Sequence, residues 1–308
     1  MARIAVLGSA SGDYYMEVAR MPRVGETLQA TDSAIRAGGK GANQAAAAGK
    51  LGGRSVFLGQ LGGDANRDLI MGTLRAATVD VSQIITLPEM LCGQAMIFLM
   101  PSGENSIVIV GGTNIAWQGV PETMKETIRA SSILLLQREI PEVVNIEAAQ
   151  VAKSAGKMVV LDVGGREEPM SQELLSLVDI ISPNETELTR LTGIEDVDEA
   201  CRWLQTHGVK HVLLKLGSQG SRYISPDFTC TQAALSRPDL PIVDTTGAGD
   251  CFTAAFVVRL LELGGVSESS VGESLRFASA AAFLGITKKG AMESIPARGE
   301  VDQFLAQL

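Results

Sequence analysis

The sequence is poor in aromatic residues, which make up 4% of its 308 residues, and it has only two histidines. It carries no apolar run that approaches the roughly 20 residues of a membrane-spanning helix. The N-terminal segment MARIAVLGS is too short, and lacks the flanks, for a signal peptide. A net charge of −9 argues against a surface for nucleic acids or anionic membranes. These features predict a cytoplasmic protein that binds neither nucleic acids nor membranes.

Cysteine is also scarce, and its spacing excludes two kinds of site. No CxxC pair is present, so neither zinc ligation nor a disulfide framework is indicated. The chain lacks a Walker A loop, a G-x-G-x-x-G after the first apolar run, a G-x-S-x-G and an HExxH. The four cysteines are therefore predicted to be core thiols in a reducing compartment: Cys92, Cys201, Cys230 and Cys251.

What is abundant is glycine, with 33 residues, in a chain that is 45% apolar and long enough to bury a large core. Short, continuous apolar runs alternate with helical segments along the chain. Such strands between helices indicate a parallel sheet that is covered on both faces. The predicted fold is α/β, a three-layer, doubly wound, mostly parallel sheet, with an antiparallel edge at residues 221–224 and 228–234.

Two segments of the chain break this alternation because they lack a helical period. Residues 94–100 and 105–110 have the pattern of a hairpin around residues 101–104, and residues 27–36 have the pattern of a further strand. Together they predict a small inserted β-sheet that acts as a lid and excludes water during the reaction. One apolar face of so small a sheet has little chain to cover it, which predicts a homodimer that pairs through the lid.

This reading divides the chain into two parts. The predicted parts are a discontinuous catalytic core of residues 1–12, 38–90 and 114–308, and a lid of residues 13–37 and 91–113.

The motif DTTGAGD at residues 244–250 leads into a long apolar helix. Its turn places the N–H groups of Gly247, Ala248 and Gly249 at the helix N-terminus, where unpaired donors and the helix dipole favour an anion. Asp250 in the same turn can take a proton from an attacking hydroxyl, which suits phosphoryl transfer to an alcohol. The simpler alternative is an aspartate that only stabilises the first turn of a helix.

A second glycine-rich turn, GGKGAN at residues 38–43, also precedes a helix. Gly38 and Gly39 allow the backbone to approach a ligand closely. Lys40 and Asn43 project donors from the same turn, and a simple surface loop does not explain Asn43 within the first helical turn. The two motifs together favour the phosphoryl-transfer reading over the simpler alternative.

Eight motifs that span about residues 4–296 resemble, in order, those of the ribokinase-like carbohydrate kinases of the phosphofructokinase-B type. They are VLGSASGD, VGETL, GGKGAN, LLLQREIP, SPNETELTRLTG, LKLGSQG, DTTGAGD and TKKGAMESIP. The resemblance implies an enzyme that uses ATP to phosphorylate the primary hydroxyl of a small sugar, in first place D-ribose to ribose 5-phosphate. It also implies Mg²⁺ and an activating K⁺.

The resemblance further implies a role for each residue that matches a motif. Asp250 would be the base, and the N–H groups of residues 247–249 would cradle the phosphoryl group. Sugar hydroxyls would be held by Ser11, Asp13, Gly39, Lys40, Asn43 and Glu139. The nucleotide and its magnesium shell would be held by Asn184, Glu187, Lys215, Gly217, Ser218, Gly220 and Ser279. A monovalent cation, which would polarise the nearby anion turn, would be held by Asp244, Thr246, Gly285, Lys288, Gly290 and Ser294.

Some of these assignments leave alternatives open. Asn184 follows Pro183 and fits a helix N-cap, which is compatible with a phosphate contact. Lys215 stands where the family usually has a small, Thr-like residue, and it is either a surface lysine or a contact to ATP phosphates. Ser11 stands where an asparagine is typical and reaches less far. Arg138, which is larger than expected, could fill the gap that Ser11 leaves.

The departure at Ser11 leaves the acceptor open. The alternatives are a ketohexose, deoxyribose, a keto-deoxy sugar acid and a nucleoside. A nucleoside would need aromatic stacking, for which the inserted segments offer only Tyr14, Tyr15 and Phe98. An alternative of another class is a non-catalytic sugar-binding module, against which the intact GAGD turn with Asp250 argues.

Overall fold

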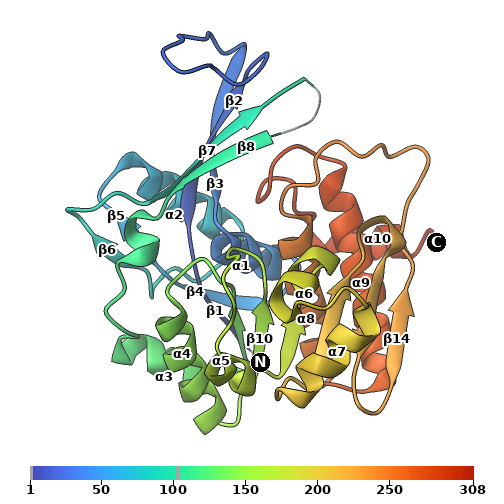
Figure 1. Ribbon diagram of the computed structural model, residues 1–308. Helices are drawn as coiled ribbons and strands as arrows, with labels where there is room; N and C mark the ends of the chain where they lie inside the picture. Colours follow the sequence, from blue (N-terminus) through green and yellow to red (C-terminus); the bar gives the residue numbers. More distant parts are fainter. Residues whose placement is uncertain (1–2, 102–104) are drawn as a thin grey trace.

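The computed structural model describes residues 3–101 and 105–308, so the turn predicted at residues 101–104 lies mostly outside the described residues. An eight-stranded sheet of order β14-β13-β12-β11-β10-β9-β1-β4 forms the centre of the molecule (Figure 1). Six strands are parallel, and β13 and β14 form the predicted antiparallel edge. The strands are β1 (Arg3–Leu7), β4 (Arg54–Leu58), β9 (Ile133–Leu136), β10 (Met158–Asp162), β11 (Ile180–Ser182), β12 (His211–Lys215), β13 (Ser221–Ile224) and β14 (Thr229–Gln232).

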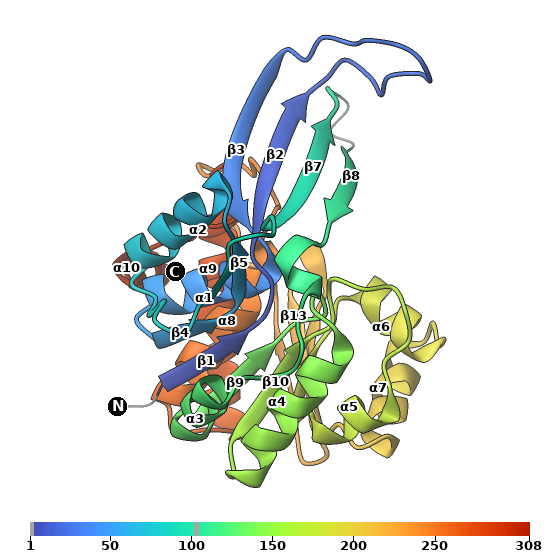
Figure 2. The same ribbon diagram turned by 90° about the vertical axis from the view of Figure 1, so that its left-hand side faces the viewer.

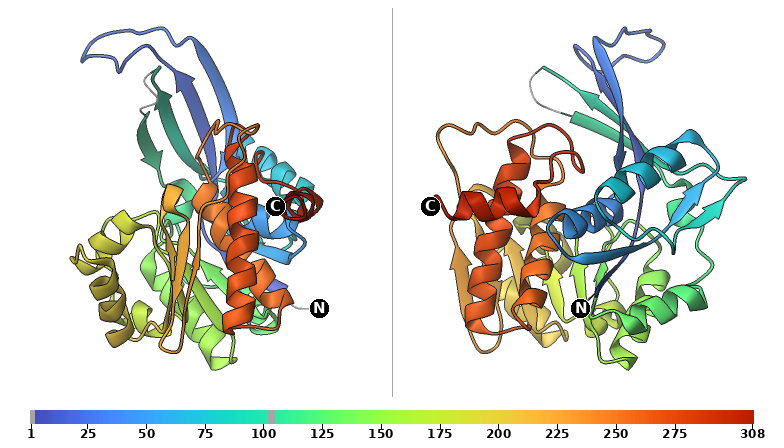
Figure 3. Two further views of the ribbon diagram at one scale, coloured as in Figure 1. Left: turned by 90° about the vertical axis from the view of Figure 1, so that its right-hand side faces the viewer. Right: turned by 180° about the vertical axis from the view of Figure 1, so that it is seen from behind.

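Helices cover both faces of this sheet, so the three-layer prediction is confirmed (Figures 2 and 3). On β9, Ile133 and Leu135 belong to one core while Leu134 and Leu136 belong to the other, because successive side chains of a strand point to opposite faces. The first core is covered by α1 (Lys40–Lys50), α2 (Ala65–Ala76), α8 (Ala248–Glu262), α9 (Glu268–Ile286) and α10 (Arg298–Leu305). The second is covered by α3 (Glu122–Ala130), α4 (Glu142–Ser154), α5 (Gln172–Leu177), α6 (Glu185–Thr192) and α7 (Val197–Thr206).

The strand order reverses at β1, which lies between β4 and β9. In open α/β sheets, ligands bind in the crevice outside the carboxyl ends of the strands at such a reversal. Ser9 follows β1 and Glu139 follows β9, so both lie at this crevice. The topology therefore fixes where a site is expected before any side chain is considered.

A second sheet, of order β3-β2-β7-β8, projects from the α/β body above the crevice (Figures 1 and 2). It contains β2 (Ser11–Glu17), β3 (Asp32–Gly38), β7 (Gly93–Leu99) and β8 (Asn105–Val110). The predicted strands at residues 94–100 and 105–110 are confirmed, but that at residues 27–36 is wrong in its start. The pairing of β2 with β3 ends at Glu17 and Asp32, and only Thr31 continues it, by donating its N–H to Glu17 O at 2.8 Å.

Short elements account for most of what the sequence patterns missed. They include α3, α5, α10, the paired strands β5 (Gln60–Gly62) and β6 (Ile85–Leu87), and the 3₁₀ turn η1 (Gly112–Ile115). The four cysteines are free thiols, as predicted, but Cys230 is only half-buried because it lies on the edge strand β14. None of the helices within residues 3–101 and 105–308 combines the length and hydropathy that crossing a bilayer requires.

Candidate active site

Two neighbouring helices, α1 and α8, begin at the crevice, and each begins at a glycine with positive φ. Gly39 has φ 89° and Gly247 has φ 74°, a conformation that side chains other than glycine rarely adopt. A Cβ at Gly39 would also lie 2.7 Å from the Cα of Ala10, inside van der Waals contact. The glycines of both motifs are therefore needed by the local backbone, and they bring the two helix N-termini together.

The first turn of α8 presents an unpaired backbone donor. Ala248 N–H donates to Thr245 O at 3.2 Å, and Cys251 N–H donates to Gly247 O at 2.9 Å. The N–H of Gly249 has no acceptor among the residues that the structure describes. A helix N-terminus with an unpaired donor can bind an anion, as the DTTGAGD motif predicted.

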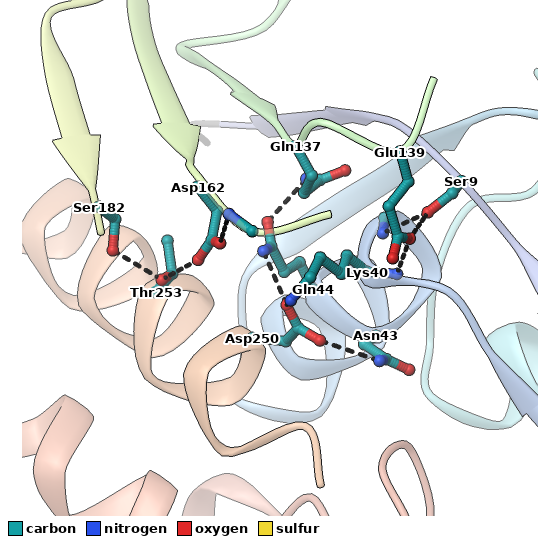
Figure 4. A network of polar contacts seen from close by, with 12 residues as sticks. Ser9, Lys40, Asn43, Gln44, Gln137, Glu139, Asp162, Ser182, Asp250 and Thr253 are labelled. Carbon is teal, nitrogen blue, oxygen red and sulfur yellow. Dashed lines mark hydrogen bonds and ion pairs between the residues drawn. The ribbon is translucent and has the colours of Figure 1, made fainter. Parts of the chain in front are cut away.

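Asp250, in the same turn, is buried, and within the described part of the chain its side-chain hydrogen bonds and ion pair come from α1 (Figure 4). Its Oδ2 accepts a hydrogen bond of 2.9 Å from Asn43 Nδ2, and its Oδ1 accepts one of 3.0 Å from Gln44 Nε2. The ammonium of Lys40 lies 3.7 Å from Oδ1. Lys40 and Asn43 were predicted to lie here, whereas Gln44 was not, because its helical position reads as core from the sequence.

Lys40 lies among carboxylates. Asp250 is the largest of the influences that raise the pKa of its ammonium above the ordinary value; Asp162 and Glu139 add to the effect, and burial opposes it. Lys40 therefore stays charged, and the site keeps a fixed cation beside Asp250. Such a cation can stabilise negative charge that develops on a transferring phosphoryl group.

Glu139 links the carboxyl end of β9 to the start of α1 (Figure 4). Its Oε2 accepts from the backbone N–H of Lys40 at 2.9 Å and from the hydroxyl of Ser9. A Cβ at Gly165 would lie 2.5 Å from Glu139 Cγ, so a small residue is required next to it. The carboxylate thus satisfies an orphan N–H of α1 and fixes that helix against the sheet.

Ser11 and Asp13 come from the lid strand β2 and were predicted to bind sugar hydroxyls. The hydroxyl of Ser11 donates to Asp13 Oδ1 at 2.6 Å. Burial raises the pKa of Asp13 to about 6; the bond from Ser11 opposes this shift, and the carboxylate of Glu139 adds to it. A Cβ at Gly38 would lie 1.9 Å from Asp13 Oδ2, so the glycine of the GGKGAN motif makes room for this carboxylate.

A second buried carboxylate, Asp162 at the end of β10, was missed by the sequence reasoning. Its Oδ2 accepts hydrogen bonds of 2.8 Å from both Lys215 Nζ and Thr253 Oγ1, and Ser182 Oγ lies 3.0 Å from Thr253 Oγ1 (Figure 4). Burial opposes ionisation, but the ammonium groups of Lys215 and Lys40 hold the pKa of Asp162 below its ordinary value. No sequence motif surrounds Asp162, so only its position at a strand end could have indicated it.

Lys215 is not a surface lysine, so that alternative is wrong. Its ammonium pairs with Asp162 at 2.8 Å and lies 4.0 Å from Glu187 Oε2. A Cβ at Gly249 would lie 3.6 Å from Lys215 Nζ. The ammonium is therefore adjacent to the anion-binding turn of α8, on the side of the sheet where the nucleotide was predicted.

Arg138 does not fill a gap beside Ser11, so that interpretation is also wrong. Its guanidinium donates to the carbonyl oxygens of Glu168 at 2.6 Å and Pro169 at 3.3 Å, and it lies 4.0 Å from Glu142. It is buried against the loop that follows β10 because that loop offers carbonyl acceptors.

The predicted nucleotide residues lie along the carboxyl ends of β11 and β12. Asn184 caps α6 in a capping box: its Oδ1 accepts from Glu187 N–H, and Glu187 Oε2 accepts from Asn184 N–H, both at 2.8 Å. The N-cap reading of Asn184 is thus confirmed. The 3₁₀ turn η2 (Gly217–Gln219) follows β12 and contains Gly217 and Ser218, with Gly220 next to it. Ser279 is buried on α9, which packs against β13 and β14.

The predicted cation loop is assembled from two segments far apart in the sequence. Asp244 Oδ1 accepts from Thr246 N–H and its Oδ2 accepts from Gly290 N–H, both at 2.9 Å. Burial acts to raise the pKa of Asp244, but these hydrogen bonds outweigh it and hold the pKa below the ordinary value. Lys288 pairs with Glu300 at 3.0 Å, so only its backbone is free to bind a cation.

Lys50, at the end of α1, was not predicted as part of this region. Its ammonium donates to the carbonyl oxygens of Met292 and Ile295, both at 3.0 Å, and to that of Glu293 at 3.4 Å. The hydroxyl of Ser294 donates to Ala291 O at 3.1 Å. Residues 291–295 are therefore held to α1, the same helix that holds Asp250.

A carboxylate buried beside a helix N-terminus, at the reversal point of a doubly wound sheet, is the arrangement of an enzyme that transfers a phosphoryl group to an alcohol. The model of the pfkB family carbohydrate kinases matches residues 1–298, and the chain belongs to this family of sugar kinases.

Individual relatives agree with this assignment. The chain is 45% identical to a ribokinase of Arabidopsis thaliana, over 98% of this chain and 80% of the relative, and 38% identical to a ribokinase of Haemophilus influenzae, over 98% of both. The solved structure of Arabidopsis thaliana ribokinase complexed with ribose and ATP superposes with a TM-score of 0.93 at 43% identity. That match covers 99% of this chain and 98% of the other.

The raised pKa of Asp13 predicts a pH dependence of sugar binding. If sugar hydroxyls donate to the ionised carboxylate, binding weakens as the pH falls through about 6, because the protonated acid offers one acceptor fewer. The dissociation constant of D-ribose, the sugar that the sequence predicts, should rise by up to about tenfold per pH unit below that point. Calorimetry between pH 5 and 8 measures it. Asp13→Asn is the control, with weak and pH-independent binding. A wild-type constant that is flat across this range would contradict the role of Asp13.

Proposed function

We propose that the protein uses ATP to phosphorylate the primary hydroxyl of D-ribose, which yields ribose 5-phosphate and ADP. The observation that carries this proposal is the contact between the two glycine-started helices, which holds the Asp250 carboxylate against α1 in the same turn of α8 as the unpaired N–H of Gly249. It is supported by ribokinase relatives that match nearly the whole chain and by the related structure with ribose and ATP.

In this reaction Asp250 accepts the proton of the C5 hydroxyl as its oxygen attacks the γ-phosphorus of ATP, and the bond to the ADP oxygen breaks. The N–H of Ala248 already donates to Thr245 O, so the N–H groups of Gly247 and Gly249 and the ammonium of Lys40 are the groups that bind the charge on the transferring group. Their fixed positions mean that little reorganisation is needed as the charge moves.

The sugar is proposed to lie between the lid strand β2 and the first turn of α1. The set that would bind it is Ser11, Asp13, Gly39, Lys40, Asn43 and Glu139. A groove of about 650 Å³ lies between the outer part of the lid and residues 242–246, and none of this set lines it. The proposed division into a core and a lid that excludes water is supported instead by the separate sheet β3-β2-β7-β8, which carries Ser11 and Asp13 on β2.

The nucleotide is proposed to lie along β11 and β12, with Lys215 close enough to the α8 turn to meet a phosphate. The remaining contacts would come from Asn184, Glu187, Gly217, Ser218, Gly220 and Ser279. Mg²⁺ prefers oxygen ligands, and Glu187 Oε1 accepts no hydrogen bond from the described residues, so it fits a place in the ion's water shell. The ion would neutralise charge on the ATP phosphates.

K⁺ is proposed at the loop formed by Asp244, Thr246, Gly285, Lys288, Gly290 and Ser294. Carboxylate, hydroxyl and carbonyl oxygens are ligands for such hard cations, and the pairing of Lys288 with Glu300 removes a competing ammonium. The cation would polarise the neighbouring turn that contains Gly247.

A second acceptor is favoured by one observation, the bond from Ser11 to Asp13. This bond occupies one lone pair of Asp13. With serine at position 11, the pocket therefore binds a sugar hydroxyl at that point less firmly than it would with asparagine there. Among the alternative acceptors, deoxyribose should lose the least affinity from this weaker contact, ahead of a ketohexose or a keto-deoxy sugar acid.

The lid supports a homodimer. β8 is an edge strand whose consecutive residues Ile107, Val108, Ile109 and Val110 are 51%, 57%, 69% and 43% exposed. Monomeric proteins usually protect such edges with charges or prolines. The four free thiols fit the predicted reducing cytoplasm.

The catalytic assignment predicts that Asp250→Asn lowers kcat by about 10²–10⁴-fold, because a general base contributes that much. Sugar affinity should change far less, since the amide keeps the size of the side chain. A coupled ADP-release assay with D-ribose, 2-deoxyribose and a ketohexose measures kcat, and calorimetry measures binding. A variant that keeps more than about a tenth of the wild-type kcat would overturn the assignment. Wild-type protein without activity on any of the sugars would overturn the proposed function.

The cation loop predicts that K⁺ raises the rate well above Na⁺ at equal ionic strength and fixed Mg²⁺. Asp244→Asn should abolish this difference, because it removes the charged ligand. Steady-state rates in K⁺, Na⁺ and a bulky organic cation make the comparison. Equal wild-type rates in all three salts would rule the site out.

The edge strand predicts that the wild-type protein sediments as a dimer and that Ile109→Lys shifts it to a monomer, because an unpaired charge would be buried between the lids. Val143→Lys, which changes a 70% exposed residue on α4, is the matched control and should remain dimeric. Monomeric wild-type protein at micromolar concentration would refute the proposal.

A further inference from the structure

A chain of buried amides continues behind Asp250, away from the proposed sugar. Gln44 Nε2 donates to Asp250 Oδ1 at 3.0 Å, and Gln137 Nε2 donates to Gln44 Oε1 at 2.7 Å (Figure 4). Both glutamines are 0% exposed. Behind them, Asn145 Nδ2 donates to the backbone carbonyl of Gln137 at 2.7 Å. This series of hydrogen bonds joins α8, α1, the residue after β9, and α4. Its two contacts between side chains join residues that are 206 and 93 positions apart in the sequence.

The direction of this chain is fixed by chemistry. An ionised carboxylate only accepts hydrogen bonds, so Gln44 must turn its NH₂ group toward Asp250 and its oxygen toward Gln137. Gln137 must then present its own NH₂ group, because two carbonyl oxygens would otherwise face each other. The orientation of Gln137 therefore determines which end of Gln44 meets the carboxylate.

Stability alone does not explain Gln137. Its Oε1 is buried and has no hydrogen-bond partner among the described residues, which is costly for a core side chain. The same oxygen lies only 2.0 Å from where a Cβ would be at Gly8, so the residue after β1 must be glycine to admit it. An apolar side chain of similar size would fill this space without an unpaired acceptor.

We propose that Gln44 and Gln137 are positioning residues that hold the Asp250 carboxylate aimed at the sugar hydroxyl. This inference rests on the proposed function, in which Asp250 is the base. Gln44 occupies Oδ1 from behind while Asn43 binds Oδ2, so rotation of the carboxylate would break one bond or the other.

Other titratable groups surround the carboxylate and stay the same in the variants below. They are Lys40 on α1, Lys215 on β12, Asp162 on β10, Glu139 after β9 and Cys251 on α8.

The test compares Gln44→Met and Gln137→Met, which keep side-chain length and remove the amides, with Gln60→Met. Gln60 is a matched control because it is buried on β5 and its Oε1 has no partner within the described part of the chain. For Gln44→Met we expect kcat at pH 7 to fall by about 10-fold or more, because a hydrogen bond to a charged group is lost. KM for D-ribose should change by less than about threefold.

Gln137→Met should lower kcat by a smaller factor, again with little change in KM, and Gln60→Met should leave both constants unchanged. Gln137→Met also serves if Gln44→Met does not fold, since it is one residue further from the carboxylate. An unchanged kcat in a folded Gln44→Met or Gln137→Met, or an equal loss of kcat in Gln60→Met, would overturn the inference. If wild-type protein phosphorylates a sugar and the variants keep its kcat, the inference fails and the proposed function stands.

Discussion

The structure depends on one buried contact, the binding of the Asp250 carboxylate by the first turn of α1. An aspartate buried to 4% exposure is costly unless its charge is compensated, and here Asn43, Gln44 and Lys40 supply donors from a single helix. Satisfying this carboxylate fixes α1 against α8, and the two glycine-started turns then meet at one point. The same contact creates both the geometry of the crevice and the charge at its centre.

Around this contact, positive and negative groups alternate. Lys40 lies between Asp250 and Asp162, and Lys215 lies between Asp162 and Glu187. Both ammonium groups lie close to the N-terminus of α8. A phosphate bound there could therefore pair with each ammonium in place of part of its interaction with the carboxylates. The lid adds Asp13 from above, which burial leaves easy to protonate near pH 6. The residues proposed to bind the sugar and those proposed to bind the nucleotide are thus linked by shared ion pairs.

The sequence predicted the fold and the glycine-rich turns well because both depend on local signals. Apolar strands, positive-φ glycines and the order of motifs all lie within short windows. It missed Gln44, Gln137 and Asp162 because their roles depend on Asp250, Gln44 and Thr253, which are far away in the sequence. Arg138 was misread for the same reason, since its acceptors are carbonyls of a loop some thirty residues later. Contacts between distant segments can be predicted only when the topology is known, because no local sequence pattern specifies which distant residue a side chain meets.

The most direct measurement is a crystal structure of the protein with D-ribose and a non-hydrolysable ATP analogue. The account predicts that the C5 hydroxyl lies within about 2.6–3.2 Å of an Asp250 oxygen, while Gln44 still donates to Oδ1 and the γ-phosphate analogue meets the α8 N-terminus. A complex in which Asp250 turns away from α1, or in which another side chain contacts the C5 hydroxyl, would contradict it.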